Sequence, residues 1–172
     1  MCIRDSFNVG RAQVMSVYPL AEKQITSKQI TDKQDGLPSV AILAFGTIAY
    51  TADSVAKQLA ESGQVSQVTM VDMRWVKPLD TDLLDRLIVE GVTHVVTLEE
   101  HVIMGGAGSA VNEYVLNHHP NANVKIRNLG IPDRFIAHGS PAEQLADCGL
   151  DEAGILASVQ AFVMPSKTEL PA

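Results

Sequence analysis

The sequence is poor in cysteine and has no long apolar run, and each deficit excludes a class of protein. Its 172 residues include two cysteines, Cys2 and Cys148, which lie far apart and outside any metal-binding spacing. A disulfide framework is therefore not indicated, and a reducing cytoplasm is the expected location. No apolar segment approaches the roughly 20 residues that a membrane-spanning helix needs, and the N-terminus lacks the apolar core of a signal peptide.

Positive charge is also scarce. Thirteen Lys and Arg residues against 20 Asp and Glu residues give a formal net charge of −7. This excess negative charge repels nucleic acid and anionic membranes, so we expect neither as a partner. The chain does have apolar material, because 46% of its residues are hydrophobic and only 19% are charged. That composition is typical of a globular domain with a buried core.

The two ends of the chain differ in pattern from its middle. The first residues, MCIRDS, resemble a translated sequencing adapter, and we expect them not to be native. Polar residues dominate the segment 7–36, which predicts a linker with at most short extended pieces. We therefore assign residues 1–37 to a linker from a truncated upstream domain, 38–163 to a folded domain and 164–172 to a frayed tail.

Between these ends, apolar runs typical of buried strands alternate with helical patterns. Strands are predicted at 39–46, 67–73, 93–100 and 124–130, and helices at 47–63, 81–90, 107–119, from 141 onward and at 151–163. This alternation predicts a three-layer α/β fold, in which a mainly parallel sheet carries helices on both faces. Ligands of such sheets gather at the carboxyl ends of the strands, so the loops that follow the four strands are the candidate site.

A glycine-rich turn follows the third predicted strand, in the segment LEEHVIMGGAGS. Its glycines are Gly105, Gly106 and Gly108. A dinucleotide-binding loop has the pattern G-x-G-x-x-G, but Val111 occupies the third glycine position. Two carboxylates, Glu99 and Glu100, precede the turn and would repel a pyrophosphate. We favour a structural role, in which the glycines let the backbone turn sharply and pack closely.

The carboxylate pair and the histidines are the other candidates at this edge. Adjacent strand residues point in opposite directions, so a single carboxylate that accepts backbone N–H bonds is favoured over a catalytic pair of Glu99 and Glu100. The five histidines form no metal-binding motif, and no metal site is expected. His101 and His138 lie on loops at the predicted ligand edge and are the most plausible polar contacts there.

A third candidate is the segment DMRWVKPLD, in which Arg74 and Lys77 flank Trp75. These residues could bind a phosphate. The alternative, which we favour, is that Arg74 and Trp75 brace the loop, with the guanidinium paired to a carboxylate or stacked on an aromatic ring.

Three segments together resemble a known family. VDMRWVKPLD (71–80), LEEHVIMGGAGSAVNE (98–113) and NLGIPDRFIAHGS (128–140) are similar in order and spacing to the C-terminal domain of the transketolase family, and most similar to its 1-deoxy-D-xylulose-5-phosphate synthases. The resemblance covers residues 38–163. It implies a homodimeric transferase that uses thiamine diphosphate and Mg²⁺ to join pyruvate to glyceraldehyde 3-phosphate, with loss of CO₂, for isoprenoid and thiamine synthesis.

The resemblance also implies that the chemistry lies elsewhere. In this family the cofactor and the catalytic residues belong chiefly to two upstream domains, whose motifs this chain lacks. We therefore expect no catalytic, cofactor-binding or metal-binding residue in this chain, and we expect it to be inactive alone and to bind neither thiamine diphosphate nor Mg²⁺. Its predicted partners are the upstream thiamine-binding domains of the same chain. The resemblance implies a structural loop and interface made of Glu99, Glu100, His101, Gly105, Gly106, Gly108, Asp133 and His138.

The sequence departs from the family's pattern in two segments, and two other interpretations of the chain remain open. The family's Y-P-R-G segment, whose arginine helps to bind the substrate phosphate, is not reproduced in residues 5–12, and Arg11 is not assigned that role. Residues 25–29 replace a segment that usually contains glycine. The same domain also ends the β subunit of 2-oxoacid dehydrogenases, where it docks an acyltransferase core. A free-standing module that binds a basic partner is the third interpretation.

Overall fold

The structure is a computed structural model that describes residues 9–20 and 36–164. The suspected adapter residues, the segment 25–29 and most of the predicted tail lie outside the described residues. The strands are β1 (Gln13–Pro19), β2 (Ser39–Phe45), β3 (Gln67–Asp72), β4 (His94–Val102) and β5 (Lys125–Ile131). The helices are α2 (Ala49–Glu61), α3 (Thr81–Val89), α4 (Ala107–His118), α5 (Pro141–Asp147) and α6 (Glu152–Val163).

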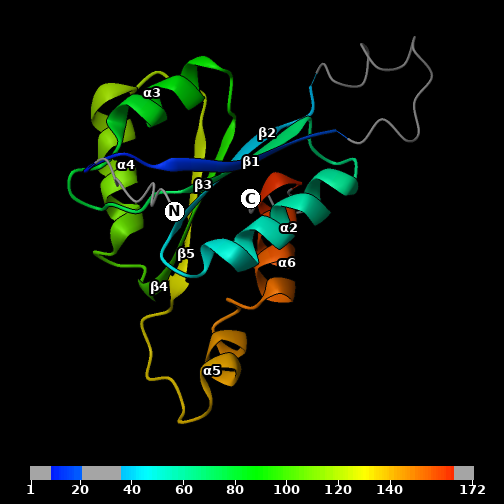
Figure 1. Cartoon of the computed structure of the whole chain (residues 1–172), viewed down its shortest axis with the longest axis vertical. Coiled ribbons are helices and arrows are strands. Elements are labelled where there is room, and N and C mark those ends of the chain that lie inside the picture. Colours follow the sequence, from blue (N-terminus) through cyan, green and yellow to red (C-terminus); the bar gives the residue numbers. More distant parts are fainter. Residues whose placement is uncertain (1–8, 21–35, 165–172) are drawn as a thin grey trace, which may run out of the picture.

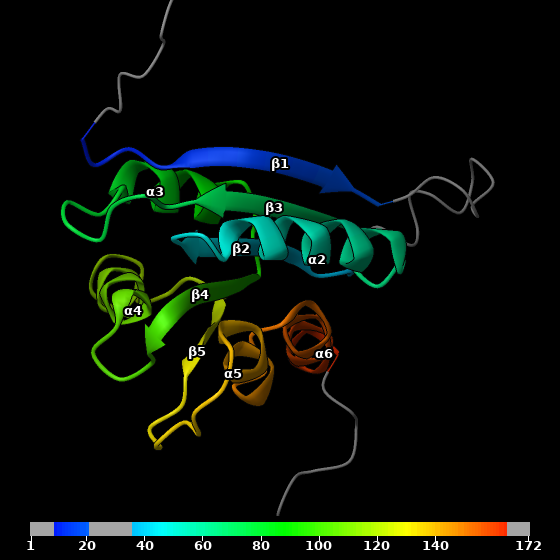
Figure 2. The same cartoon turned by 60° about the horizontal axis from the view of Figure 1, so that its bottom comes forward.

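The middle layer is a five-stranded sheet with the order β1-β3-β2-β4-β5, which can be followed from top to bottom in Figure 2. Strand β2 pairs in parallel with β3 and β4, and β4 pairs in parallel with β5. All four predicted strands are present, and each is followed by a helix. The prediction of a mainly parallel α/β sheet is therefore confirmed.

Each face of the sheet has its own apolar core. Successive side chains of a strand point in opposite directions, so alternate residues of the central strand β2 pack on opposite faces of the sheet. Ile42 packs with α2 and α6 on one face, whereas Leu43 packs with α3 and α4 on the other. Both side chains have no exposed surface. The three-layer arrangement (Figure 1) thus follows from a central strand that is apolar on both sides.

Strand β1 is an addition to the predicted sheet. The sequence predicts a linker with at most short extended pieces at 7–36, but Gln13–Pro19 runs antiparallel to β3 as an edge strand. Its residues are exposed or half-buried, so they lack the apolar run that marks the central strands. The Tyr18 hydroxyl reaches over the edge and donates to Asp53 Oδ1 of α2 at 3.0 Å.

Asp80 ties the start of this edge strand to α3. Its carboxylate caps the helix by accepting the N–H of Leu83 at 3.2 Å. The same carboxylate accepts the N–H of Ala12 at 2.9 Å and a guanidinium N–H of Arg11 at 3.1 Å. Arg11 also pairs with Asp82 at 2.6 Å. Arg11 is therefore held in a local ion-pair cluster at the edge of the sheet.

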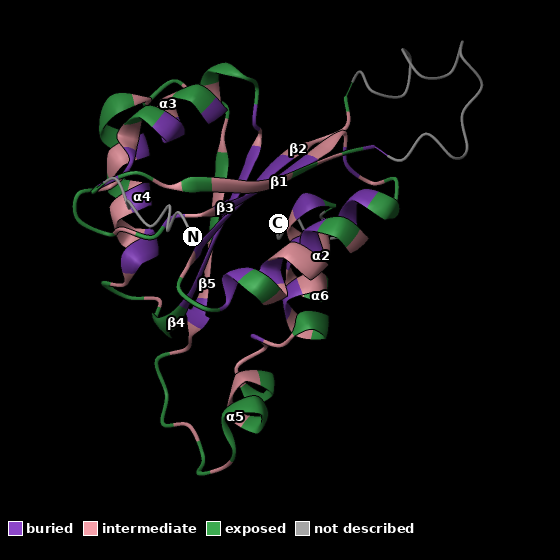
Figure 3. Ribbon diagram, viewed as in Figure 1, coloured by how far each residue is buried: buried purple, intermediate pink, exposed green. Residues whose placement is uncertain are grey.

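The C-terminal helices begin at the residues that the sequence indicates. Ser140 and Glu143 form a capping box at α5, and Asp151 caps α6. Helix α5 has no buried residue and projects from the body with the loop that precedes it (Figures 1 and 3). Within the described residues, no helix is long and apolar enough to cross a membrane.

His94, at the start of β4, is a buried titratable group. Only 6% of it is exposed, and its ring lies edge-on to Phe162 of α6, with 5.0 Å between ring centres. Thr93 Oγ1 contacts Nδ1 at 2.9 Å, but Nε2 has no hydrogen-bond partner among the described residues. Burial, and secondly the positive charge of Lys125, lowers the pKa of His94 below its ordinary value of 6.5.

This environment predicts that the protein loses stability as the pH falls below about 6.5. Below that pH the unfolded chain protonates His94, whereas the folded chain resists protonation until its own lower pKa is reached. The free energy of unfolding should therefore be highest above this window and decrease through it. Urea unfolding between pH 8 and pH 5 measures this, and a His94→Gln variant should have a flatter profile. His138→Gln, at an exposed position, should keep the wild-type slope.

Candidate functional site

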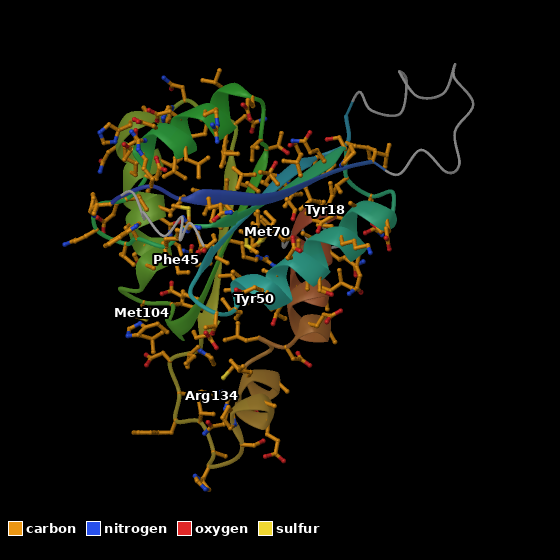
Figure 4. All side chains as sticks on the ribbon, viewed as in Figure 1. Tyr18, Phe45, Tyr50, Met70, Met104 and Arg134 are labelled. Carbon is orange, nitrogen blue, oxygen red and sulfur yellow. The ribbon has the colours of Figure 1, made fainter. Side chains whose placement is uncertain are left out.

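The loops that follow β2, β3, β4 and β5 meet at the carboxyl end of the sheet. In Figure 4 the labelled Phe45, Tyr50 and Met104 lie toward this end, below Tyr18 and Met70. The predicted site residues Glu99, Glu100 and His101 lie at the end of β4, Gly105 and Gly106 lie in the turn that follows, and Gly108 lies in the first turn of α4. Asp133 and His138 belong to the loop after β5. The topology therefore brings these loops to one edge, as a parallel sheet requires.

Glu99 is the most buried charged group at this edge. Its side chain is directed to the start of α4, where Oε2 accepts the N–H of Ala107 at 2.7 Å and Oε1 accepts the N–H of Gly108 at 2.9 Å. The residue is 3% exposed. A carboxylate at this position meets two unpaired backbone donors and the positive end of the helix dipole. One glutamate thus caps α4, in the manner that the sequence favours over a catalytic pair.

This arrangement explains the glycine-rich turn. A phosphate bound at a helix N-terminus would use the same N–H groups that Glu99 occupies. A β-carbon at Gly106 would lie 2.4 Å from Glu99 Oε2 and 2.4 Å from the carbonyl oxygen of Val102. Gly105 has a φ of +74°, which favours glycine. The turn therefore holds the chain's own carboxylate in the place where a nucleotide phosphate would bind.

Glu100 points the other way. It is exposed, and its Oε2 accepts the hydroxyl proton of Thr47 at 2.7 Å, which links the loops after β4 and β2. Glu99 faces α4, whereas Glu100 faces the start of α2. The two carboxylates therefore do not converge as an acid–base pair.

The pairing of β4 with β5 shifts beside this turn. The regular register ends at Leu98, and pairing resumes with Val102 opposite Ile131. At the shift the backbones approach closely, because a β-carbon at Gly130 would lie 2.7 Å from the carbonyl oxygen of His101. Sequence reasoning missed Gly130 as a site residue. A glycine between the apolar residues Leu129 and Ile131 was the available signal, since a glycine in a strand often marks a close backbone approach.

A cluster of polar side chains lies between α4 and the strands β4 and β5. Asn112 of α4 donates to Asn128 Oδ1 of β5 at 2.9 Å, and Thr97 of β4 is fully buried beside them. A β-carbon at Gly108 would meet Asn128 Nδ2 at 2.0 Å and Thr97 Oγ1 at 2.4 Å. Gly108 therefore lets the first turn of α4 lie directly on these side chains. These residues are also absent from the sequence predictions, because three different elements contribute them.

Arg74 matches the interpretation that it braces the loop after β3. The Arg74 backbone is left-handed, with a φ of +58°, and its N–H donates to Asp72 Oδ1 at 3.1 Å. The guanidinium pairs with the same carboxylate at 3.4 Å and contacts the side chain of Gln13. Trp75 and Tyr50 line a neighbouring hollow of about 440 Å³.

The loop after β5 is fixed by Arg134. Its guanidinium donates to Asp147 Oδ2 at 2.7 Å and to the Asp147 carbonyl oxygen at 2.9 Å, which ties the loop to the end of α5. The predicted site residues Asp133 and His138 are exposed. His101 is exposed as well, with Nδ1 3.4 Å from the carbonyl oxygen of Val102. In the part of the chain that the structure describes, no cluster of His, Cys, Asp and Glu could hold a metal ion.

The histidines near the end of α4 form a separate cluster. Asp85 Oδ1 of α3 accepts from the Tyr114 hydroxyl and from His119 Nε2, each at 2.7 Å. The ring of His118 stacks on Tyr114, with 4.4 Å between ring centres. The hydrogen bond from Tyr114, followed by that from His119, lowers the pKa of the Asp85 carboxyl. This cluster joins α3 to α4 and lies on a different part of the surface from the glycine turn.

The loops at the carboxyl end also expose several large apolar side chains. They are Tyr50 after β2, Val76 after β3, Val102 at the end of β4, Met104 after β4 and Phe135 after β5. We call this set the carboxyl-edge face. A hollow of about 400 Å³ opens on it, lined by Phe45, Val76, Glu99, Glu100, His101, Gly105, Gly106 and Ala107.

Residues 30–155 match the family described as "Transketolase, C-terminal domain". A 1-deoxy-D-xylulose-5-phosphate synthase from Psychrobacter cryohalolentis is 53% identical over 156 residues, which are 86% of this chain and 22% of that protein. The synthase from Psychrobacter arcticus is 50% identical over 161 residues, again 22% of its length. The chain thus spans about a fifth of the length of these relatives.

Among solved structures, a protein described as a split gene transketolase in an inactive β4 tetramer has a similar fold. The TM-score is 0.69 and the sequence identity is 29%, over 91% of this chain and 43% of that chain.

The cap formed by Glu99 predicts that Glu99 contributes more to the free energy of unfolding than its neighbour Glu100. Glu99→Gln replaces one acceptor oxygen with an amide donor that faces a backbone N–H. We expect it to lower the free energy of unfolding by about 1–3 kcal/mol. Glu100→Gln changes an exposed side chain and should stay within about 0.5 kcal/mol. Urea unfolding of both variants measures the difference, and equal losses would contradict the assignment of the cap to Glu99.

The close packing of Gly108 predicts that an alanine there is more destabilising than an alanine at Gly139. Gly108→Ala should lower the free energy of unfolding by about 1–3 kcal/mol, because the added methyl group overlaps Asn128 and Thr97. Gly139→Ala is the control, since the nearest atom to its β-carbon is the exposed Glu143 carboxylate at 3.3 Å. It should change stability by less than about 0.5 kcal/mol. Chemical denaturation of the two variants would refute the packing argument if Gly108→Ala proved neutral.

Proposed function

The chain belongs to the transketolase C-terminal domain family, and from this premise we propose that it is the C-terminal part of a thiamine-diphosphate-dependent 1-deoxy-D-xylulose-5-phosphate synthase. The identities of 53% and 50% to the two Psychrobacter synthases support the synthase as parent. The parent would be a transferase that joins pyruvate to glyceraldehyde 3-phosphate and releases CO₂, which supplies isoprenoid and thiamine synthesis.

The described residues do not fit thiamine diphosphate or its metal ion. A diphosphate needs backbone or cationic donors, but the donors at the glycine turn already serve Glu99. The turn also carries two carboxylates, which would repel a diphosphate. In the described part of the chain no side-chain cluster suits Mg²⁺. The proposed parent would therefore bind its cofactor, and carry out its catalytic steps, in upstream domains.

The contribution of this chain, in our proposal, is to support those domains. The observation that carries it is the buried Glu99 cap, which makes the glycine turn a rigid part of the surface instead of a cofactor loop. Beside the turn, the carboxyl-edge face exposes apolar side chains that a partner would cover. The predicted interface residues Glu100, His101, Asp133 and His138 lie on the same loops. The proposed assembly is a homodimer of the full parent chain.

A docking domain of a 2-oxoacid dehydrogenase β subunit is the second candidate, because the fold alone is compatible with either parent. The named synthase relatives favour the first. The DNA upstream discriminates the two parents: one long reading frame with both thiamine-domain motifs indicates the synthase. The proposed location is the cytoplasm, which the scarcity of cysteine supports.

The proposal can be tested with a chimera, in which this chain replaces the matching C-terminal segment of the Psychrobacter cryohalolentis synthase. We expect the chimera to form 1-deoxy-D-xylulose 5-phosphate from pyruvate and glyceraldehyde 3-phosphate, and the synthase without that segment to form none. The isolated 172-residue chain, with thiamine diphosphate and Mg²⁺ added, should show neither turnover nor a thermal shift. Saturable binding of thiamine diphosphate by the isolated chain, or a folded but inactive chimera, would overturn the proposal.

A further inference from the structure

We propose that the carboxyl-edge face docks a basic segment of the upstream part of the parent chain, and that a lysine or arginine of that segment enters the hollow beside Glu99 and Glu100. This inference rests on the proposed function and adds the chemistry of the partner. It follows from three properties of the face: its exposed apolar side chains, the shape of its hollow, and the balance of its charges.

The apolar side chains are unusually exposed. Phe135 is 102% exposed, Tyr50 78% and Met104 74%. Phe135 lies on the loop after β5, Tyr50 in the first turn of α2 and Met104 on the loop after β4. Helix α5, which follows the loop of Phe135, buries none of its residues. Large apolar side chains that gather on one face, with polar groups around them, mark a surface for another protein.

The hollow suits a long cationic side chain. Phe45 and Val76 provide apolar walls, along which the methylene stem of a lysine or arginine can lie. Glu99 and Glu100 line the same hollow of about 400 Å³, where a charged head group would meet them. A carboxylate offers about four acceptor positions, and Glu99 uses one on each oxygen for backbone N–H groups. Glu99 can therefore still accept from an incoming cation.

The charge balance favours a cation over an anion. On these loops Arg74 is paired with Asp72 and Arg134 is paired with Asp147. Lys77 is the remaining lysine or arginine of the loops after β2, β3, β4 and β5. Glu99, Glu100 and Asp133 have no cationic partner among the described residues. Glu99 is also a buried charge, which two backbone N–H groups stabilise and which no cation opposes among the described residues. A basic partner would neutralise carboxylates that the domain leaves unpaired.

The same balance disfavours a second copy of this chain as the occupant. In a two-fold symmetric contact the same patch meets itself, so Glu100 and Asp133 of one copy would face carboxylates of the other. Like charges that face each other at such a contact repel and so disfavour it. The face is instead complementary to a different surface, and the upstream part of the proposed parent is the occupant to which we commit.

The hollow is already formed in the isolated domain. The hydrogen bond from Thr47 to Glu100 fixes one wall, and the two bonds from the start of α4 to Glu99 fix another. A partner side chain would therefore enter a prepared site without ordering these loops first, which favours affinity.

The experiment uses the active chimera described above. Hydrogen–deuterium exchange should show the segments 99–106 and 131–138 exchanging more slowly in the chimera than in the isolated chain. The double variant Glu100→Lys/Asp133→Lys should abolish this difference, with exchange at least about tenfold faster, because it sets positive charge against the basic partner. The control Glu61→Lys/Glu113→Lys makes the same change of net charge at exposed positions away from the face, and should behave as the unmodified chimera.

The outcomes separate the two proposals. An inactive unmodified chimera contradicts the proposed function itself. If that chimera is active and the Glu100 and Asp133 reversal matches the control, the basic partner is refuted. Concentration-dependent dimers of the isolated chain that dissociate on this reversal would show a second copy as the occupant, which also refutes it. If the reversed chimera fails to fold, Glu100→Gln/Asp133→Asn should still loosen the same two segments, and an unchanged exchange rate in that variant would count against the inference.

Discussion

The carboxyl end of the sheet depends on one interaction, the buried carboxylate of Glu99 on the first N–H groups of α4. It satisfies donors that would otherwise be unpaired, and it puts a negative charge where the helix dipole favours one. Gly106 and Gly108 are required because side chains there would overlap the carboxylate or the polar residues beneath the helix. The same interaction occupies the position in which related α/β folds place a phosphate. The chemistry of the loop is thus decided by a residue at the end of the preceding strand.

Much of the fold could be predicted from the sequence, because the central strands are continuous apolar runs and the helix caps are local signals. Ser140 with Glu143, for example, needs only a spacing of three residues. Strand β1 could not be found in this way, because no continuous apolar run marks it. Every residue of this edge strand is exposed or half-buried. At the site, the alternation of strand side chains predicted that a single carboxylate accepts backbone N–H groups, and the structure identifies it as Glu99. Gly130 and Asn128 were not, because their importance arises from contacts between strands that are distant in sequence.

The charges of the domain are arranged unevenly. On the loops of the carboxyl edge the arginines are matched by nearby carboxylates, whereas several glutamates and aspartates face outward without a cation among the described residues. The Asp85 cluster and the Asp80 cluster, in contrast, satisfy their carboxylates internally. The domain therefore has closed polar networks around α3 and unpaired carboxylates beside the glycine turn and on the loop after β5. A surface of this kind suits a permanent neighbour within a larger protein.

Strand β1 is held at both of its ends. Asp80 receives the backbone of Ala12 at one end, and the N–H of Leu20 donates to the carbonyl oxygen of Ser66 at 3.0 Å at the other. Tension applied to the polypeptide before residue 12 would therefore act on α3 through a carboxylate and an ion pair. The start of β1 is thus tied to α3 as well as to β3, so that a pull on the preceding residues would be shared between a helix and the sheet.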